Sequence, residues 1–126
     1  MHNIWIADDD EAIRMVLEEG LKSSELAITT FANGESLIEA LNEDQPDLII
    51  SDIKMPGIHG YDLLKHIKNN YEKIPVIIMT AFTDMQAAID AYGGGAFEYI
   101  PKPFDLSEAL QIVTRALEEN KSPACC

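Results

Sequence analysis

Residues 48–57 read LIISDIKMPG, a short apolar run that ends at an acidic residue and is followed by a Pro-Gly pair. An almost continuous apolar run of this kind is typical of a parallel strand that is buried on both faces of a sheet. Other strand-like runs are NIWIA at 3–7, LAITTF at 26–31, VIIMT at 76–80 and FEYIP at 97–101. Together with 48–51, these runs predict five strands.

Helical periodicity follows each of these strands. Apolar residues recur at helical spacing in five segments: Ile13, Val16, Leu17 and Leu21; Leu37, Ile38 and Leu41; Leu63, Leu64 and Ile67; Met85, Ala88, Ile89 and Tyr92; and Leu110, Val113, Ala116 and Leu117. Asp105 and Glu108 stand at capping-box spacing before the last segment. Strict alternation of strands and helices implies a parallel sheet with helices on both faces.

The predicted fold class is α/β: a flavodoxin-like, doubly wound, five-stranded parallel sheet with five helices. We expect the strand order 2-1-3-4-5, which is taken from known folds of this kind and does not follow from the alternation alone. Ligands bind such sheets beyond the carboxyl ends of the strands. The residues that follow each strand are therefore the candidates for a functional site.

The composition excludes several classes of protein. The chain has 126 residues, of which 47% are apolar, and this is enough for one domain with its own core. Its net charge of −13 disfavours direct binding of nucleic acid. No apolar run approaches the roughly 20 residues of a membrane span, and Cys125 and Cys126 are adjacent, so they form no disulfide framework. We expect a cytoplasmic protein without a membrane segment.

Chemically active residues follow four of the predicted strands. Asp8 and Asp9 follow the first strand, Asp52 the third, Thr80 closes the fourth, and Lys102 follows the fifth. Each alone is weak evidence, because an acidic residue after a strand commonly caps the next helix. Since all the strands are parallel, these residues should meet at one edge of the sheet. The sequence therefore predicts three carboxylates, a hydroxyl and an ammonium group at the edge where ligands bind.

This set of groups suits the formation of an acyl phosphate. Clustered carboxylates repel one another, and a hard divalent cation such as Mg²⁺ relieves the repulsion. A carboxylate is also a competent nucleophile toward phosphorus. Asp52 is the best candidate because it ends the middle strand, between the acidic pair and the Thr80 and Lys102 side. Thr80 and Lys102 are placed to hold phosphoryl oxygens.

Four stretches resemble response-regulator receiver domains: IWIADDDEAIR at 4–14, SDIKMPGIHG at 51–60, PVIIMTA at 75–81 and AFEYIPKPFD at 96–105. The segment 79–105 resembles the NtrC-type, nitrogen-regulatory subfamily, and the match extends over essentially the whole chain. The resemblance implies that Asp52 is the phosphoacceptor. It also implies a Mg²⁺ site formed by Asp9, which binds directly, Asp8, which binds through water, Asp52, and the backbone carbonyl of Lys54.

The resemblance also implies a conformational switch. Thr80 and Lys102 would contact the phosphoryl group, and the Lys102–Pro103 peptide bond would be cis. Tyr99 matches the aromatic residue that turns inward when Thr80 moves toward the phosphate. The change would re-pack the surface formed by the fourth helix and the fifth strand, and so control an effector domain.

The resemblance also implies partners and a longer protein. We expect phosphoryl transfer from a sensor histidine kinase, with Mg²⁺-dependent self-phosphorylation and slow autodephosphorylation rather than enzymatic turnover. NtrC-type regulators carry an ATPase domain that acts on sigma-54 polymerase and a DNA-binding domain. Neither has a counterpart here, so we expect 1–120 to be the receiver and 121–126 to be the start of a linker or a disordered tail in a longer transcriptional activator.

Alternatives remain at this stage. One alternative function is a pseudo-receiver that only mediates protein contacts, and another is a stand-alone single-domain regulator. Formation of a homodimer on phosphorylation is a further alternative. A haloacid-dehalogenase-type phosphatase is disfavoured, because Lys54 stands where its second carboxylate is needed. A flavodoxin is disfavoured because the acidic run that begins at Asp8 would repel its phosphate ligand.

Overall fold

The structure is a computed structural model that describes residues 2–53, 57, 60–71, 73–81, 93, 95–102 and 105–121. Strands and helices alternate through most of this part of the chain. Its elements are β1 (His2–Ala7), α1 (Glu11–Leu21), β2 (Leu26–Phe31), α2 (Gly34–Leu41), β3 (Leu48–Asp52), α3 (Gly60–Asn70), β4 (Val76–Ala81), β5 (Glu98–Lys102) and α5 (Leu106–Lys121). The five predicted strands are confirmed, and no strand end differs from its predicted position by more than one residue.

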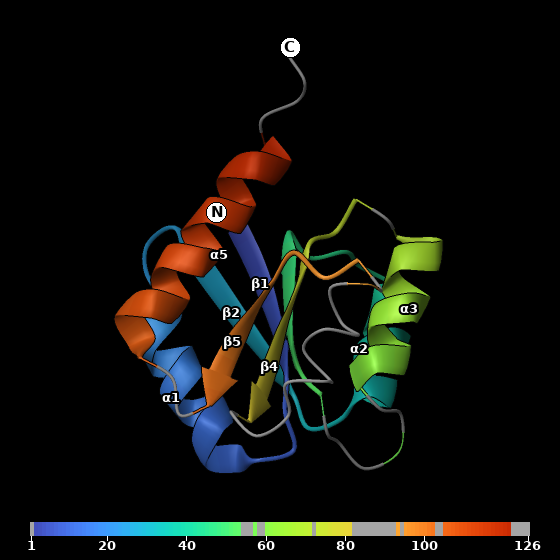
Figure 1. Cartoon of the computed structure of the whole chain (residues 1–126), viewed down its shortest axis with the longest axis horizontal. Coiled ribbons are helices and arrows are strands. Elements are labelled where there is room, and N and C mark those ends of the chain that lie inside the picture. Colours follow the sequence, from blue (N-terminus) through green and yellow to red (C-terminus); the bar gives the residue numbers. More distant parts are fainter. Residues whose placement is uncertain are drawn as a thin grey trace.

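The strands form one parallel sheet of order β2-β1-β3-β4-β5, as expected. The register pairs Ala7 with Ser51, and Asp52 with Met79, so β1, β3 and β4 end close together. Figure 1 shows the sheet between two layers of helices, with the arrowheads of β4 and β5 at its lower edge. The predicted flavodoxin-like architecture is confirmed.

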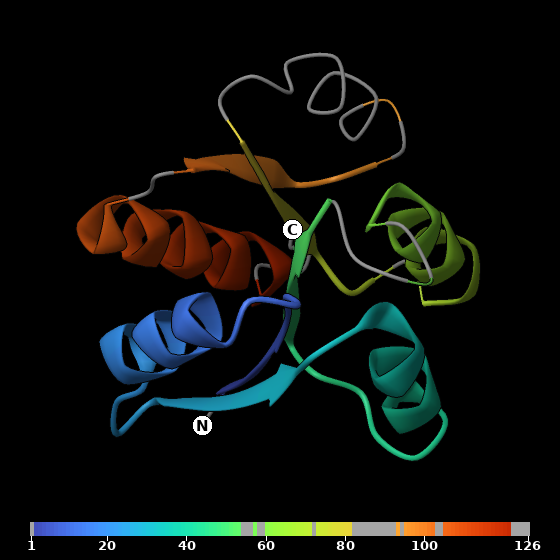
Figure 2. The ribbon, with the colours of Figure 1, turned by 90° about the horizontal axis from the view of Figure 1, so that it is seen from below.

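Two apolar clusters cover the two faces of the sheet. Figures 1 and 2 show α1 and α5 on one face and α2 and α3 on the other. On the α1 and α5 side the buried helical residues include Leu17, Leu21 and Val113. On the α2 and α3 side the buried residues are led by Leu37, Leu41, Leu63, Leu64 and Ile67. The fourth helix expected around 85–92 lies outside the described residues.

Polar caps define where the helices begin. The Asp10 side chain accepts a hydrogen bond from the Ala12 N–H at 2.9 Å and caps α1. Asn33 caps α2 by accepting from the Ser36 N–H at 2.8 Å. Asp105 accepts from the Ser107 N–H at 2.8 Å at the start of α5. Each cap satisfies a backbone donor that the helix itself leaves unpaired.

Two positions assigned to apolar helix faces are solvent-exposed, which corrects the prediction. Val16 is 47% exposed and Leu110 is 40% exposed, whereas their neighbours Leu17 and Ala109 are fully buried. The side chains of successive helical residues differ by about 100° in direction. When only a narrow face of the helix is buried, the residue next to a buried one therefore points into solvent. In α5 the small Ala109 faces the sheet in place of Leu110. Within the described part of the chain, every helix is too short or too polar to span a membrane.

Candidate functional site

Three carboxylates meet at the carboxyl edge of the sheet. Asp8 and Asp9 follow β1, Asp52 ends β3, and one carboxylate oxygen from each lies within 4.8 Å of the others. The cause is the sheet register, because Ala7 and Ser51 are paired and the residues after them must be neighbours. Oxygen ligands gathered at this spacing fit a hard divalent cation. The predicted convergence of these residues is confirmed, and together they could hold a metal ion.

The three carboxylates differ in their access to solvent. Asp8 is fully buried and Asp52 is 7% exposed, whereas Asp9 is exposed. Burial raises the cost of bringing negative charges together, because the interior screens charge poorly. The exposed Asp9 leaves one side of the cluster open to solvent. The arrangement is thus an acidic site that is open to solvent on the side of Asp9.

Hydrogen bonds hold the loop that carries the acidic pair. The Asp8 N–H donates to the Phe31 carbonyl at 3.1 Å, and the Asp8 carboxylate accepts from the Asp10 N–H at 2.9 Å. The Asp8 carbonyl accepts from Nη1 of Arg14 at 2.7 Å. Asp10 is used as the cap of α1. The acidic run from Asp8 to Glu11 therefore divides into two residues at the cluster and two at the start of α1.

Backbone contacts also fix Asp52 at the end of β3. The Ser51 hydroxyl donates to the Asp52 carbonyl at 2.9 Å, and the Ile53 N–H donates to the Met79 carbonyl at 3.0 Å. Ser51 is itself fully buried between strands. Asp52 therefore extends from a rigid central strand, which suits a group that must hold one position for chemistry.

The remaining predicted residues lie on the β4 and β5 side of the site. Thr80 pairs with Pro101, and Ala81 pairs with Lys102, at the carboxyl ends of these strands. The backbone therefore brings Thr80 and Lys102 to the same edge as Asp52. Their side chains lie outside the described part of the structure, as do Lys54 and Pro103. Their roles stay predictions.

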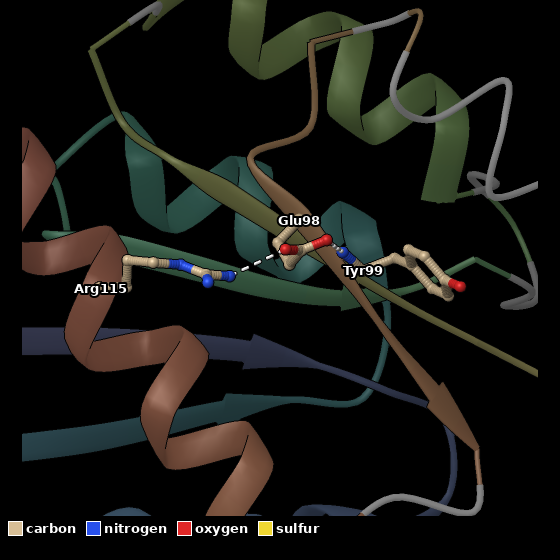
Figure 3. Close-up of polar contacts among 3 residues, drawn as sticks. All are labelled: Glu98, Tyr99 and Arg115. Atoms are coloured by element: carbon tan, nitrogen blue, oxygen red, sulfur yellow. Dashed lines mark hydrogen bonds and ion pairs between the residues drawn. The ribbon is translucent and has the colours of Figure 1, made fainter.

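Tyr99 lies on β5, where it pairs with Ile78 and is half-buried against the α2 and α3 cluster. Its N–H donates to Oε1 of Glu98 at 3.2 Å, and Oε2 of Glu98 is 2.8 Å from Nη2 of Arg115 on α5 (Figure 3). The Arg115 guanidinium is also 5.9 Å from the centroid of the Phe97 ring. Figure 3 shows the Tyr99 ring pointing away from Arg115. The inward turn of Tyr99 stays a prediction.

The sequence did not predict the contacts made by three residues: Arg14, Glu98 and Arg115. Arg14 reaches a backbone carbonyl six residues earlier, and Arg115 reaches a carboxylate seventeen residues earlier. Neither spacing belongs to a recurrent motif. The helical position of Arg14, close after an acidic run, is the one sequence signal near the first contact, and it does not identify the acceptor.

Comparison with known proteins identifies the family. Residues 4–114 match the family of response regulator receiver domains. The DNA-binding transcriptional regulator NtrC of Escherichia coli K12 is 50% identical over 123 residues, which are 95% of this chain and 26% of that protein. NtrC of Azospirillum brasilense is 42% identical over 121 residues, or 96% of this chain and 25% of that protein. The chain thus spans about a quarter of the length of these curated relatives.

A solved structure supports the same assignment. The solution structure of the apo receiver domain of nitrogen regulatory protein C has a TM-score of 0.86 and is 48% identical in sequence. The match covers 95% of this chain and 97% of that domain. The strand order described above agrees with this likeness in fold. The chain therefore belongs to the response regulator receiver domain family and, within that family, is of the NtrC type.

Proposed function

We propose that this chain is the phosphoacceptor receiver domain of a bacterial two-component response regulator, and that Asp52 accepts the phosphoryl group from a sensor histidine kinase. The observation that carries the proposal is the cluster of Asp8, Asp9 and Asp52 at the carboxyl edge of the sheet. A cation site beside a carboxylate on a rigid strand end is the arrangement that phosphoryl transfer to that carboxylate requires.

The proposed reaction needs little covalent chemistry from the protein. A carboxylate oxygen of Asp52 forms a bond to phosphorus, and the bond from phosphorus to the imidazole nitrogen of the kinase breaks. The electron pair of the broken bond goes to that nitrogen. The step leaves an aspartyl phosphate, so the domain is modified stoichiometrically rather than turning over substrate.

Mg²⁺ is the proposed cofactor, since the available ligands are oxygens. When bound, it supplies neutralising positive charge beside the phosphoryl oxygens. Asp9 would bind it directly, Asp8 through water, and Asp52 and the Lys54 carbonyl would complete the protein ligands. Thr80 and Lys102 would contact the phosphoryl oxygens from the β4 and β5 side, where their backbones lie.

Asp52 is favoured as the nucleophile over its two neighbours. It ends the strand that lies between β1 and β4, so both sides of the proposed site flank it. The carboxylate of Asp8 is fully buried and accepts a hydrogen bond from the Asp10 N–H, which suits a fixed ligand. Asp9 lies on the solvent side.

Signalling would follow from movement of Thr80 toward the phosphoryl group and inward rotation of Tyr99. The half-buried position of Tyr99 supports this role, because a small rotation changes its packing. The similarity to NtrC supports a cytoplasmic transcription regulator whose further domains are an ATPase acting on sigma-54 polymerase and a DNA-binding domain. Phosphorylation-dependent pairing of receivers is part of the same proposal.

The test is phosphorylation by acetyl phosphate with Mg²⁺, followed by intact-mass spectrometry. We expect one phosphoryl group on the unaltered chain and none on Asp52→Asn. Asp47→Asn is a matched control, because Asp47 precedes the same strand at its other end, and it should be modified normally. Undiminished incorporation in Asp52→Asn contradicts the assignment of the nucleophile. No incorporation into the unaltered chain, from this donor or a phosphorylated kinase, favours a pseudo-receiver.

A further inference from the structure

We propose that Arg14 is a positioning residue for the cation site: its guanidinium holds the peptide that joins Asp8 to Asp9, and so directs the Asp9 carboxylate toward Asp8 and Asp52. This inference rests on the proposed function, because it requires that the cluster bind Mg²⁺. It adds to that function a residue that contributes no ligand atom.

The contact that carries the inference is short and partly buried. Nη1 of Arg14 donates to the Asp8 carbonyl oxygen at 2.7 Å. A hydrogen bond of this length from a charged donor is among the stronger ones in proteins. The backbone N–H of Arg14 also donates to the Asp10 carbonyl at 3.1 Å, as part of the first turn of α1. Arg14 thus ties the helix to the loop on both sides of Asp9.

Holding one carbonyl determines the direction of the next residue. The peptide group between Asp8 and Asp9 is planar, so restraining its oxygen also restrains the Asp9 nitrogen and Cα. The other end of Asp8 is held by its N–H bond to the Phe31 carbonyl at 3.1 Å. With both sides of Asp8 held, the remaining freedom of Asp9 is mainly in its side-chain rotamers.

Asp9 depends on this backbone support more than its partners do. Its carboxylate is exposed, and the described residues provide no hydrogen bond to it. Asp8 and Asp52, in contrast, are buried, and the Asp8 carboxylate accepts from the Asp10 N–H. Yet an oxygen of Asp9 lies within 4.8 Å of both. Its place in the cluster therefore follows from the backbone that Arg14 holds.

If only the charge of Arg14 mattered, this residue would weaken Mg²⁺ binding instead of supporting it. A guanidinium bonded to the Asp8 carbonyl puts positive charge near a site for a cation, and like charges repel. If only charge mattered, removal of Arg14 would tighten Mg²⁺ binding. If positioning dominates, removal weakens binding, because Asp9 is no longer directed at the site. The sign of the change in affinity separates the two effects.

The experiment measures Mg²⁺ affinity by isothermal titration calorimetry on the whole chain. We expect Arg14→Ala to weaken binding by about 10-fold or more, the usual size of effect for groups that orient metal ligands. Arg14→Lys keeps a charge and a donor and should recover most of the lost affinity. Lys22→Ala is the matched control: it removes the same charge at the far end of α1, where Lys22 pairs with Glu19, and should leave binding unchanged.

Each result decides the inference. Arg14→Ala binding Mg²⁺ as tightly as the unaltered chain, or more tightly, overturns the positioning role and leaves the proposed function intact. Arg14→Lys binding as weakly as Arg14→Ala also overturns it, since the donor would then be irrelevant. Absence of Mg²⁺ binding to the unaltered chain overturns both proposals. Thermal melts without Mg²⁺ accompany the titrations, and a weakened affinity supports the inference where the variant stays folded at the titration temperature.

Discussion

The amino and carboxyl ends of the parallel sheet both carry acidic side chains, but these have different neighbours. At the amino end, Oδ2 of Asp47 accepts a hydrogen bond from the Asn3 N–H at 2.7 Å and lies 3.8 Å from Nδ1 of His2. Glu98, the first residue of β5, lies 2.8 Å from Nη2 of Arg115 (Figure 3). Both contacts join an acid to a donor near solvent.

At the carboxyl end the acids face one another. Asp8, Asp9 and Asp52 lie within 4.8 Å, and two of the three are buried. The same residue type, placed at either end of β3, is therefore a surface hydrogen-bond acceptor as Asp47 and a member of an acidic cluster as Asp52. Pairing with donors stabilises a fold, whereas clustering like charges costs stability unless a cation binds. Such a loss of stability is typical of a functional site.

The largest effect that tests this contrast is the response of stability to Mg²⁺. Binding to the native state alone stabilises it by about 2.7 kcal/mol when free Mg²⁺ is 100 times its Kd, which corresponds to a rise in Tm of about 10 °C for a domain of this size. Asp9→Asn should lose most of this rise, because a direct ligand is removed, whereas Asp47→Ala should keep it. Calorimetric melts in EDTA and in excess Mg²⁺ make the measurement. An equal rise in Tm in the two variants would show that the two ends of the sheet do not differ in Mg²⁺ binding.

Without metal, we expect substitutions at the two ends of the sheet to change the free energy of unfolding by smaller amounts and in opposite directions. In EDTA and low salt, Asp9→Asn should stabilise the domain by about 1 kcal/mol, because it removes one of three mutually repelling charges. Asp47→Ala should destabilise it by about 0.5–1 kcal/mol, because the Asn3 N–H loses its acceptor. Urea unfolding gives both values. Destabilisation by Asp9→Asn would show that the cluster is not strained by repulsion.

The strands could be predicted from the sequence because they follow from short-range rules, and the acidic cluster could be predicted once a known strand order was added to them. Buried parallel strands are apolar runs, and 48–51 was recognised on that basis, with Asp52 added to β3 by the structure. Parallel strands end at one edge, so Asp8, Asp9 and Asp52 had to converge once β1 and β3 were neighbours. That adjacency came from known folds and not from the residues.

Contacts that depend on the rotation of a helix could not be predicted. Whether Arg14 reaches the Asp8 carbonyl depends on how α1 lies against the sheet, and the apolar pattern determines that direction only coarsely. The same imprecision explains the misassigned Val16 and Leu110, each one residue from a fully buried neighbour. Glu98 and Arg115 lie on different elements, so their pairing also required the tertiary structure.

The smallest expected effect concerns Glu98 and Arg115, whose side chains are 28% and 52% exposed. Exposed ion pairs contribute up to about 1 kcal/mol and are screened by salt. A double-mutant cycle with Glu98→Gln and Arg115→Ala should therefore give a coupling below about 1 kcal/mol that falls on adding ~0.5 M salt. Glu98→Gln keeps an oxygen that can accept from the Tyr99 N–H, so it isolates the loss of charge. A coupling above about 2 kcal/mol that ignores salt would mean that charge is also desolvated at the amino end. The two ends would then differ only in the sign of the neighbouring group, and burial of charged groups would no longer distinguish the functional edge.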